Sequence, residues 1–264
     1  MADALDQVAF LARSENRVEA LLALDSGPTT RPDLQDRTGI PRATLSRILA
    51  DFRERDLATR TGHEFALTAL GELLADEVGS TLDAVEAVQR LEAVREWLSM
   101  DAFEFPVGRL ADADVVLASA EDPTAPIRRA EALLRDASQV RLVANSMIPG
   151  CLEAVWRACT TGRQTLVWVS TPTALDVVAD DPELARRTRE LLDSENAAGY
   201  VHEAGFPQAL FVVDETVFAP VKDDAGTVRG HVETGDPVVR EWAAESIDAY
   251  VAAAEPLGPE VLTP

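Results

Sequence analysis

The sequence of 264 residues contains a single lysine, Lys222, and only two cysteines, Cys151 and Cys159. The two cysteines lie eight residues apart on one expected helix, about 12 Å apart along its axis, which is too far for a disulfide bond between them. Neither their spacing nor the position of the three histidines is typical of a zinc site. We therefore expect both cysteines to be small buried apolar residues, and we expect no metal and no other cofactor.

Long hydrophobic runs are missing as well. No apolar run reaches the roughly 18 residues that a membrane span requires. The first ten residues, MADALDQVAF, lack the basic region and apolar core of a signal peptide. Hydrophobic residues still make up 47% of the chain, enough to build cores, and the length leaves room for two domains. We expect a soluble, cytoplasmic protein without membrane contact.

Positive charge is scarce and unevenly distributed. The chain has 24 Lys and Arg residues against 46 acidic residues, a formal net charge of −22. Residues 1–63 carry nine arginines and ten acids, a net of −1, and residues 64–264 carry a net of −21. Such acidity maintains solubility by self-repulsion, and together with the near-absence of lysine it resembles the proteome style of salt-accumulating archaea. A surface that binds DNA is therefore expected only in the first part.

The first part has the element order of a winged helix-turn-helix. Apolar periodicity predicts helices over 4–24, 31–38 and 41–56, with Ser14 capping a second segment inside the first of them. Residues 57–67 have two short strand-like pieces around a Thr-Gly-His turn, which predicts a hairpin. We assign residues 1–69 to this domain.

The twenty residues 31–50, RPDLQDRTGIPRATLSRILA, carry the helix-turn-helix itself. Apolar Leu34, Ile40, Leu45 and Ile48 stand where two crossing helices need them, and Gly39 stands in the turn, where a positive φ is required. The outer face of the second helix is then left to enter the major groove, where arginines read guanine edges or phosphates and hydroxyls bind phosphates. The expected DNA contacts are Arg31, Pro41, Arg42, Ala43, Thr44, Ser46 and Arg47, with Arg60, Thr61 and His63 in the wing.

The segment TGIPRATLSRIL resembles the turn and recognition helix of archaeal winged-helix regulators of the type that includes the IclR-like helix-turn-helix. Gln35 departs from the small alanine that many helix-turn-helix proteins carry at that position. The resemblance implies sequence-specific binding to double-stranded DNA. The alternative is a winged helix used only for protein contacts. Arg42 and Arg47 at outer positions, with no acid among residues 37–50, favour DNA.

A long helix is expected over 70–100, because apolar residues recur there at three- and four-residue intervals, close to a coiled-coil seam. We assign residues 70–104 to a connecting segment whose stripe pairs with its counterpart in a homodimer, which implies a palindromic operator. The alternative is that the stripe packs on the second domain of the same chain. The stripe consists of Leu73, Leu74, Val78, Leu82, Val85, Val88, Leu91, Val94, Trp97 and Leu98.

Strands and helices alternate in the remainder, residues 105–264. The alternation predicts βαβ units and a largely parallel sheet, followed by antiparallel strands, so the chain is assigned to the α/β class with a C-terminal mixed sheet. The first three expected strands are 115–119, 140–144 and 165–170, with helices at 126–137, 150–161 and 173–194. Later strands are expected at 200–203, 209–213, 217–221 and 228–232, before a closing helix at 236–254.

Polar residues end each of the three strands expected to be parallel. Ligand pockets in such sheets form beyond the carboxyl ends of the strands. We expect Ser119, Asn145, Ser146 and Ser170, with Arg229 as an anion-binding residue, to contact a small-molecule effector. The alternative for the first four is ordinary capping of the helices that follow, and for Arg229 a surface position.

The order of this half is also similar to that of haloarchaeal regulators whose second half is called the methanogenesis regulatory protein middle domain. The similar segments are VVLASAEDP, QVRLVAN, FVVDETVFAPV, DDAGTVRGHVETGDP and AAAEPLG, within residues 105–257. The resemblance implies a regulatory domain whose ligands are mostly undefined, with a fold related to phospholipase-like sheets.

Phospholipases of that kind need a paired His-x-Lys motif, and this sequence has none. It also lacks a Gly-rich phosphate loop and a nucleophile elbow. We therefore expect no catalytic residues and no enzyme activity, and we interpret the chain as a ligand-responsive transcriptional regulator. The competing interpretation is a non-DNA-binding adaptor or an enzyme that uses the winged helix for protein contacts.

Overall fold

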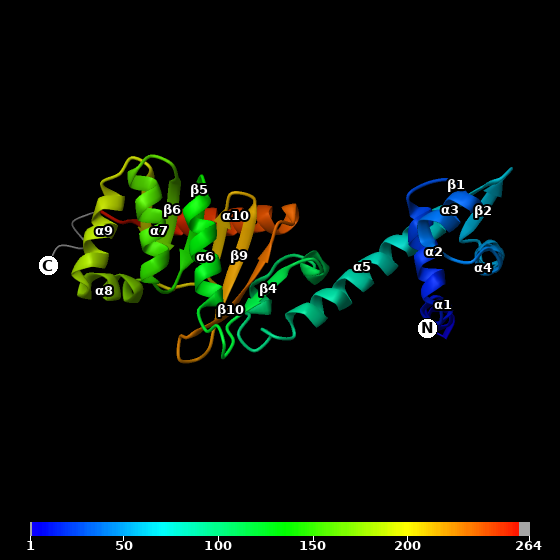
Figure 1. The fold of residues 1–264 in the computed structure, drawn as a ribbon, viewed down its shortest axis with the longest axis horizontal. Coiled ribbons are helices and arrows are strands. Elements are labelled where there is room, and N and C mark those ends of the chain that lie inside the picture. The colour runs from blue at the N-terminus through cyan, green and yellow to red at the C-terminus, as the bar shows by residue number, and fades with distance from the viewer. Residues whose placement is uncertain (1, 259–264) are drawn as a thin grey trace. The chain divides into compact units, whose positions relative to one another are not determined.

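The computed structural model describes residues 2–258 and divides the chain into two compact units, Met1–Asp83 and Ala84–Pro264. The three expected segments, 1–69, 70–104 and 105–264, are thus replaced by two, because the long helix α5 (Ala69–Leu91) contributes its first part to one core and its end to the other. Residues 259–264 of the expected last segment lie outside the described residues. Figure 1 shows the elements of both units.

The first unit has the winged helix-turn-helix order that the sequence predicts. Its strands form an antiparallel sheet in the order β1-β3-β2, with the first a two-residue strand too short for a period-two pattern to predict. The helices are α1 (Ala2–Ala12), α2 (Glu15–Asp25), α3 (Arg31–Thr38) and α4 (Arg42–Glu54), and the strands are β1 (Thr29–Thr30), β2 (Ala58–Thr61) and β3 (Glu64–Leu67).

The core of this unit is built from the apolar residues that the helix-turn-helix pattern placed inside. Leu34, Ile40, Leu45 and Ile48 are all buried, at 2% exposure or less, and Phe52 from the next turn of α4 joins them. Burying side chains of this size contributes about 1.5–3 kcal/mol each, so the crossing of α3 and α4 is strongly specified.

Helix α5 ends at Leu91 and not near residue 100 as expected, and turns follow over residues 92–97. The apolar stripe is divided accordingly. Leu74 and Val78 pack on the core of the first unit, and Val94 lies in the core of the second. The alternative interpretation of the stripe therefore holds for its last part, where tertiary packing overrides the helical periodicity.

The second unit is built on a mixed eight-stranded sheet in the order β11-β7-β6-β5-β8-β9-β10-β4. Only β5, β6 and β7 pair in parallel, and all other neighbours are antiparallel. The strands are β4 (Asp114–Leu117), β5 (Gln139–Ala144), β6 (Thr165–Ser170), β7 (Ala197–Val201), β8 (Leu210–Val213), β9 (Thr216–Lys222), β10 (Val228–Thr234) and β11 (Glu255–Pro256).

Two strand assignments are corrected by this topology. The first expected parallel strand, β4, pairs antiparallel with β10 at the sheet edge, and β7, expected to be antiparallel, is parallel to β6. A short apolar run shows that a strand is buried but does not specify its neighbour, because strand preference depends on the packing of the whole sheet.

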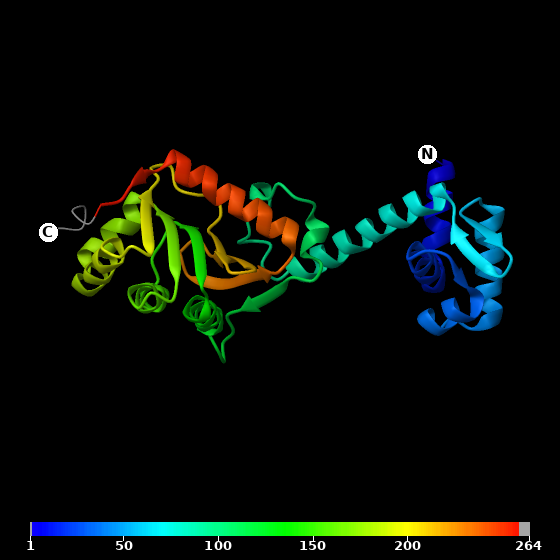
Figure 2. The same cartoon turned by 90° about the horizontal axis from the view of Figure 1, so that it is seen from above.

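Helices cover both faces of the sheet (Figure 2). One face carries α6 (Ala125–Asp136), α7 (Pro149–Thr160), α8 (Pro172–Asp180) and α9 (Pro182–Leu192), and the other carries α10 (Pro237–Ala253) and the segment 91–113. The single helix expected over 173–194 is two helices. Asp181 accepts hydrogen bonds from the backbone of Glu183 and Leu184 and starts α9, with a proline in its first turn. No helix in residues 2–258 is long and apolar enough to span a membrane.

A charged cluster joins α6 to β10, with Glu233 and His231 buried and Arg129 partly exposed. The Arg129 guanidinium lies 2.6 Å from a carboxylate oxygen of Glu233, and His231 Nε2 lies 3.2 Å from the other oxygen. The hydrogen bond to His231, and after it the one from Arg129, lower the pKa of Glu233 to about 2, although the side chain is almost wholly buried. A carboxyl group whose pKa is lowered this far by folding stabilises the folded state when it is ionised.

Replacing Glu233 with Gln is expected to lower the free energy of unfolding at pH 7 by about 3 kcal/mol, the value of a shift from 4.5 to about 2. Because the pKa is lowered in the folded state, the contribution is complete above the unfolded value and is lost as pH falls from about 5 to 2. Urea unfolding at a series of pH values measures it. Wild type and Glu233→Gln should converge near pH 2, whereas the exposed control Glu121→Gln should follow wild type throughout. A gap between wild type and variant that is independent of pH contradicts this assignment.

Candidate functional site

The helix-turn-helix is positioned by short-range signals at both ends of α3. The Thr30 hydroxyl accepts a hydrogen bond from the Asp33 amide at the start of α3, and Gly39 ends it in the left-handed conformation, at φ 66°. Pro41, at φ −56°, then stands as the N-cap of α4. A side chain with a Cβ is strained at φ 66°, so the glycine allows the chain to turn sharply into the recognition helix.

The outer face of α4 carries the residues that the sequence analysis placed there. Pro41, Arg42, Ala43 and Arg47 are exposed, while Thr44 is half-buried. The opposite face of α4, which includes Leu45 and Ile48, is buried, and this burial directs the exposed residues outward.

Ser46 and Arg31 hold the two helices together. The Arg31 guanidinium in α3 donates to Ser46 Oγ in α4 at 2.9 Å, and Ser46 Oγ donates in turn to the Arg42 carbonyl at 2.7 Å. Both side chains are half-buried. The structure therefore gives these two expected DNA contacts a positioning role, with the phosphate-binding capacity of the Ser46 hydroxyl already engaged inside the chain.

The arginines of the two units differ in how many of them form ion pairs. Within residues 4–83, only Arg17 of the nine arginines forms an ion pair, at 3.2 Å from Asp51. Within residues 84–258, ten of the fourteen arginines are paired with acids of the same unit. Arg42 and Arg47 are therefore exposed cations whose charge no carboxylate in the described part of the chain neutralises by direct contact.

The wing is the hairpin of β2 and β3. Gly62, at φ 62°, turns the chain, and Thr61 and His63 are exposed beside it. Arg60 Nε donates to the Gly62 carbonyl at 2.9 Å, and its guanidinium lies 5.4 Å from the centre of the Phe65 ring. The wing residues thus form one exposed group, with Arg60 held by the turn.

The five expected ligand residues do not form one site. Ser119 follows β4, which is four strands from β5 in the sheet, about 19 Å at the usual strand spacing. There its hydroxyl accepts a hydrogen bond from the Asp122 amide. Arg229 forms an ion pair with Asp223 at 2.6 Å. The grouping of Ser119 with the others is therefore wrong, because it assumed that β4 belongs to the parallel strands. Arg229 has the surface position that was given as its alternative, with Asp223 as its anionic partner.

Asn145, Ser146 and Ser170 do lie together at the carboxyl ends of β5 and β6. Asn145 makes two hydrogen bonds to the backbone of Phe206, at 2.7 and 3.0 Å, and so holds the loop after β7. Ser170 is buried, and the next residue, Thr171, caps α8. Only Ser146 of the three lines a cavity.

That cavity lies between the sheet and the helices α6, α7 and α9, with a volume of about 70 Å³. Its walls are apolar, and they include Leu142, Trp168 and Phe211 from three neighbouring strands. Lys222, at the end of β9, reaches it and donates to Ser146 Oγ. In the sequence, Lys222 stands out only as the single lysine. Its position in an apolar strand was the available signal, but only the sheet order places it beside Ser146.

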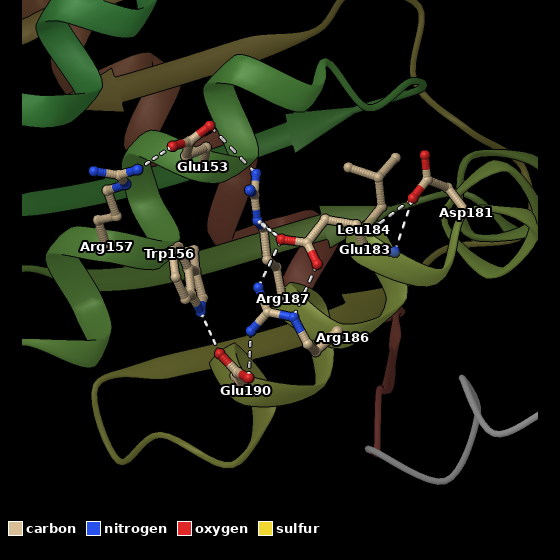
Figure 3. Close-up of polar contacts among 9 residues, drawn as sticks. All are labelled: Glu153, Trp156, Arg157, Asp181, Glu183, Leu184, Arg186, Arg187 and Glu190. Atoms are coloured by element: carbon tan, nitrogen blue, oxygen red, sulfur yellow. Dashed lines mark hydrogen bonds and ion pairs between the residues drawn. The ribbon is translucent and has the colours of Figure 1, made fainter.

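A charged network fastens the α9 wall of this cavity to α7 (Figure 3). Arg187 lies 3.4 Å from Glu153 of α7 and 2.9 Å from Glu183, which also pairs with Arg186. Trp156 Nε1 donates to Glu190 at 2.7 Å. The network spans the two helices that contribute Cys151 and Thr188 to the cavity, so it holds those walls at a set spacing.

Comparison with solved structures gives three matches that cover between 55% and 92% of this chain. TrmBL2, an archaeal chromatin protein with a novel mode of DNA binding, is 15% identical, with 92% of this chain and 94% of that chain covered at a TM-score of 0.44. The phospholipase D family member Nuc from Salmonella typhimurium is 14% identical, and NucT from Helicobacter pylori 9%. Both cover 55% of this chain, 97% and 98% of their own, at a TM-score of 0.44.

Comparison with curated protein sequences finds no significant match. Two family models do match. Residues 5–90 match the HVO_A0261 N-terminal domain, and residues 123–253 match the middle domain of the methanogenesis regulatory protein FilR1. The first match runs from within α1 through the helix-turn-helix and the wing to near the end of α5, and the second spans the strands and helices from α6 to α10. The resemblance to archaeal winged-helix regulators is confirmed, because the first part of the chain is similar to the HVO_A0261 N-terminal domain family and the second part is similar to the FilR1 middle domain family.

Proposed function

We propose that this chain is a sequence-specific, DNA-binding transcriptional regulator that binds its operator as a homodimer and responds to a small-molecule effector. The observation that carries the proposal is the exposed outer face of α4, where Arg42 and Arg47 have no ion pair among residues 2–258. In this proposal α4 enters the major groove and the wing contacts the phosphate backbone. The second unit senses and does not catalyse, and the chain works in a salt-rich cytoplasm.

The dimer rests on the middle of α5. Leu82, Val85 and Val88 are 39%, 49% and 57% exposed. In most helices a contiguous apolar stripe of this kind is covered by another part of the protein or by a partner. Pairing two copies along these residues buries them and gives two recognition helices related by a two-fold axis, which matches a palindromic operator.

The test of the proposal is an electrophoretic shift of fragments from the chain's own genome by the full-length protein, with unrelated DNA as competitor. We expect a discrete set of fragments to be retained against excess competitor. Retention of none, by a protein whose circular dichroism shows it to be folded, would favour the adaptor or enzyme alternative.

The division of charge predicts an unusual dependence on salt. DNA affinity normally falls steeply with salt, because phosphate contacts release counterions. Residues 64–264 carry a net of −21 and repel DNA, and salt screens this repulsion over a Debye length of about 8 Å or less at physiological ionic strength and above. For the full chain we expect a shallow or inverted slope of affinity against salt.

The segment 1–83, which has its own core, serves as the comparison. It should show the ordinary negative slope on the same DNA, with weaker affinity because the second unit is absent. Binding of both proteins is measured across one salt series, with folding checked at each point. Two equally steep negative slopes would mean that the acidic unit lies too far from the DNA to act on it.

A further inference from the structure

We propose that the cavity under α7 is a binding site for a small apolar carboxylate, with Lys222 and Ser146 holding the carboxylate and the apolar walls holding the tail. Every residue that lines this cavity lies in the second unit, on one face of the sheet. The proposal gives the effector of the proposed function a site and a chemical class. Only its regulatory meaning rests on that function, because binding itself is measured without DNA.

The charge of the cavity is the first argument. Lys222 is half-buried, and burial lowers the pKa of its ammonium group. Among residues 2–258 no carboxylate forms an ion pair with it, although this chain has 46 acidic residues and pairs most arginines of the same unit. Its hydrogen-bond partner is the neutral Ser146 hydroxyl. Partly buried charges in proteins are normally paired, so an unpaired ammonium in an apolar cavity favours an anionic ligand.

The walls are the second argument. The other residues that face the cavity are almost all apolar, contributed by β5, β6, β8 and α7. The thiol of Cys151 adds no charge, because burial raises its pKa to about 12. One cationic group set in an otherwise apolar cavity is the arrangement that recognises a single anionic head on a hydrocarbon tail.

An unpartnered hydroxyl is the third argument. Thr188 in α9 is 1% exposed, lines the cavity, and its hydroxyl is among the buried polar atoms that have no hydrogen-bond partner in the described structure. A threonine in a helix commonly bonds the carbonyl one turn earlier, and leaving a buried hydroxyl unpaired costs about 1–3 kcal/mol. The wall of the cavity therefore carries an unsatisfied hydroxyl, as expected where a ligand completes the site.

The volume limits the ligand. A cavity of about 70 Å³ is roughly half the size of one that holds benzene, so the tail has on the order of three to five carbons. Short straight or branched aliphatic carboxylates meet this limit, and long-chain fatty acids do not. A phosphate ligand fits the site less well than a carboxylate, because phosphates are commonly bound by several arginine guanidinium groups and this site offers one ammonium group.

The experiment is a calorimetric titration of the full chain with sodium pentanoate, and with pentan-1-ol and acetate as probes that lack the charge or the tail. We expect saturable binding of pentanoate, at least about tenfold weaker binding of pentanol, and little binding of acetate. Lys222→Met, which retains the apolar stem, should weaken pentanoate binding by about tenfold or more, as expected for a hydrogen bond to a charged group. The matched control is Arg163→Met, an exposed cation of the same unit outside the cavity, which should bind as wild type does.

A second variant provides an independent test in case Lys222→Met does not fold. Ala144→Leu fills the cavity and leaves Lys222 in place, so it should also abolish binding while keeping the charge. Failure of wild type to bind pentanoate, equal binding by wild type and by a folded Lys222→Met, or equal binding of pentanol would each overturn the proposal. If the ligand-free, folded protein retains no DNA fragment in the shift assay while pentanoate still binds, the proposed function is overturned and this site is left standing.

Discussion

Replacing both Arg42 and Arg47 with alanine is expected to reduce operator affinity by at least about 30-fold while leaving folding intact. Each arginine that contacts a base edge contributes about 1–3 kcal/mol, so the double variant loses roughly 2–6 kcal/mol of binding free energy. Both side chains are exposed and free of ion pairs within residues 2–258, so their removal should change the free energy of unfolding by no more than about 0.5 kcal/mol.

The single variants distinguish reading of bases from binding of phosphates. An arginine on a guanine edge should relax specificity at one operator position, whereas one on a phosphate should weaken all sequences alike. Fluorescence anisotropy with the operator and with single-base variants measures both. Arg163→Ala, in the second unit, is the control for loss of one positive charge. Wild-type affinity in the double variant would place the DNA-binding surface on another part of the chain.

Substitution of Val85 and Val88 by aspartate is expected to convert the proposed dimer into monomers and to lower operator affinity by about 100-fold or more. Two linked recognition helices gain roughly 10²–10⁴ in affinity over one, and four new carboxylates in the paired helices repel each other. Both valines are about half exposed, so the monomer should still fold.

Light scattering at micromolar concentration measures the oligomeric state, and anisotropy measures DNA affinity. Arg90→Glu is the matched control, because it changes the charge by the same two units on the opposite side of α5, two residues beyond Val88. It should remain dimeric. A monomeric wild type would refute the interface, and a dimeric Val85→Asp, Val88→Asp variant would move it away from the middle of α5.

Local sequence patterns predicted the first unit almost completely. Helix α3 begins and ends at the expected residues, and Gly39 has the positive φ that the turn requires. These features are encoded by neighbours in the sequence: a capping threonine, a glycine and apolar residues at three- and four-residue spacing. Strand β1 was not predicted, because its two residues form a strand only by pairing with β3.

Most elements of the second unit were predicted, but the division of the helix over 173–194, the strand β11 and the arrangement of the sheet were missed. The strands 140–144 and 165–170 and the helix between them are where the apolar runs placed them. The edge position of β4 and the parallel pairing of β7 were missed, because a buried run is equally apolar beside either neighbour. The candidate ligand site inherited the error about β4, which is why Ser119 was grouped with residues far from it.

Composition and periodicity by themselves determined that this protein has a winged helix with outward-facing arginines, an acidic second part and a mixed sheet. Those properties depend on charge counts and on contacts between residues close in sequence. Only the tertiary structure decided that Lys222 meets Ser146 across 76 residues, that α5 leaves Val85 and Val88 uncovered, and that Arg31 is bonded to Ser46. Each of these depends on which distant segments become neighbours, and the free energy that selects the neighbours is summed over whole cores, so no short stretch of sequence carries it.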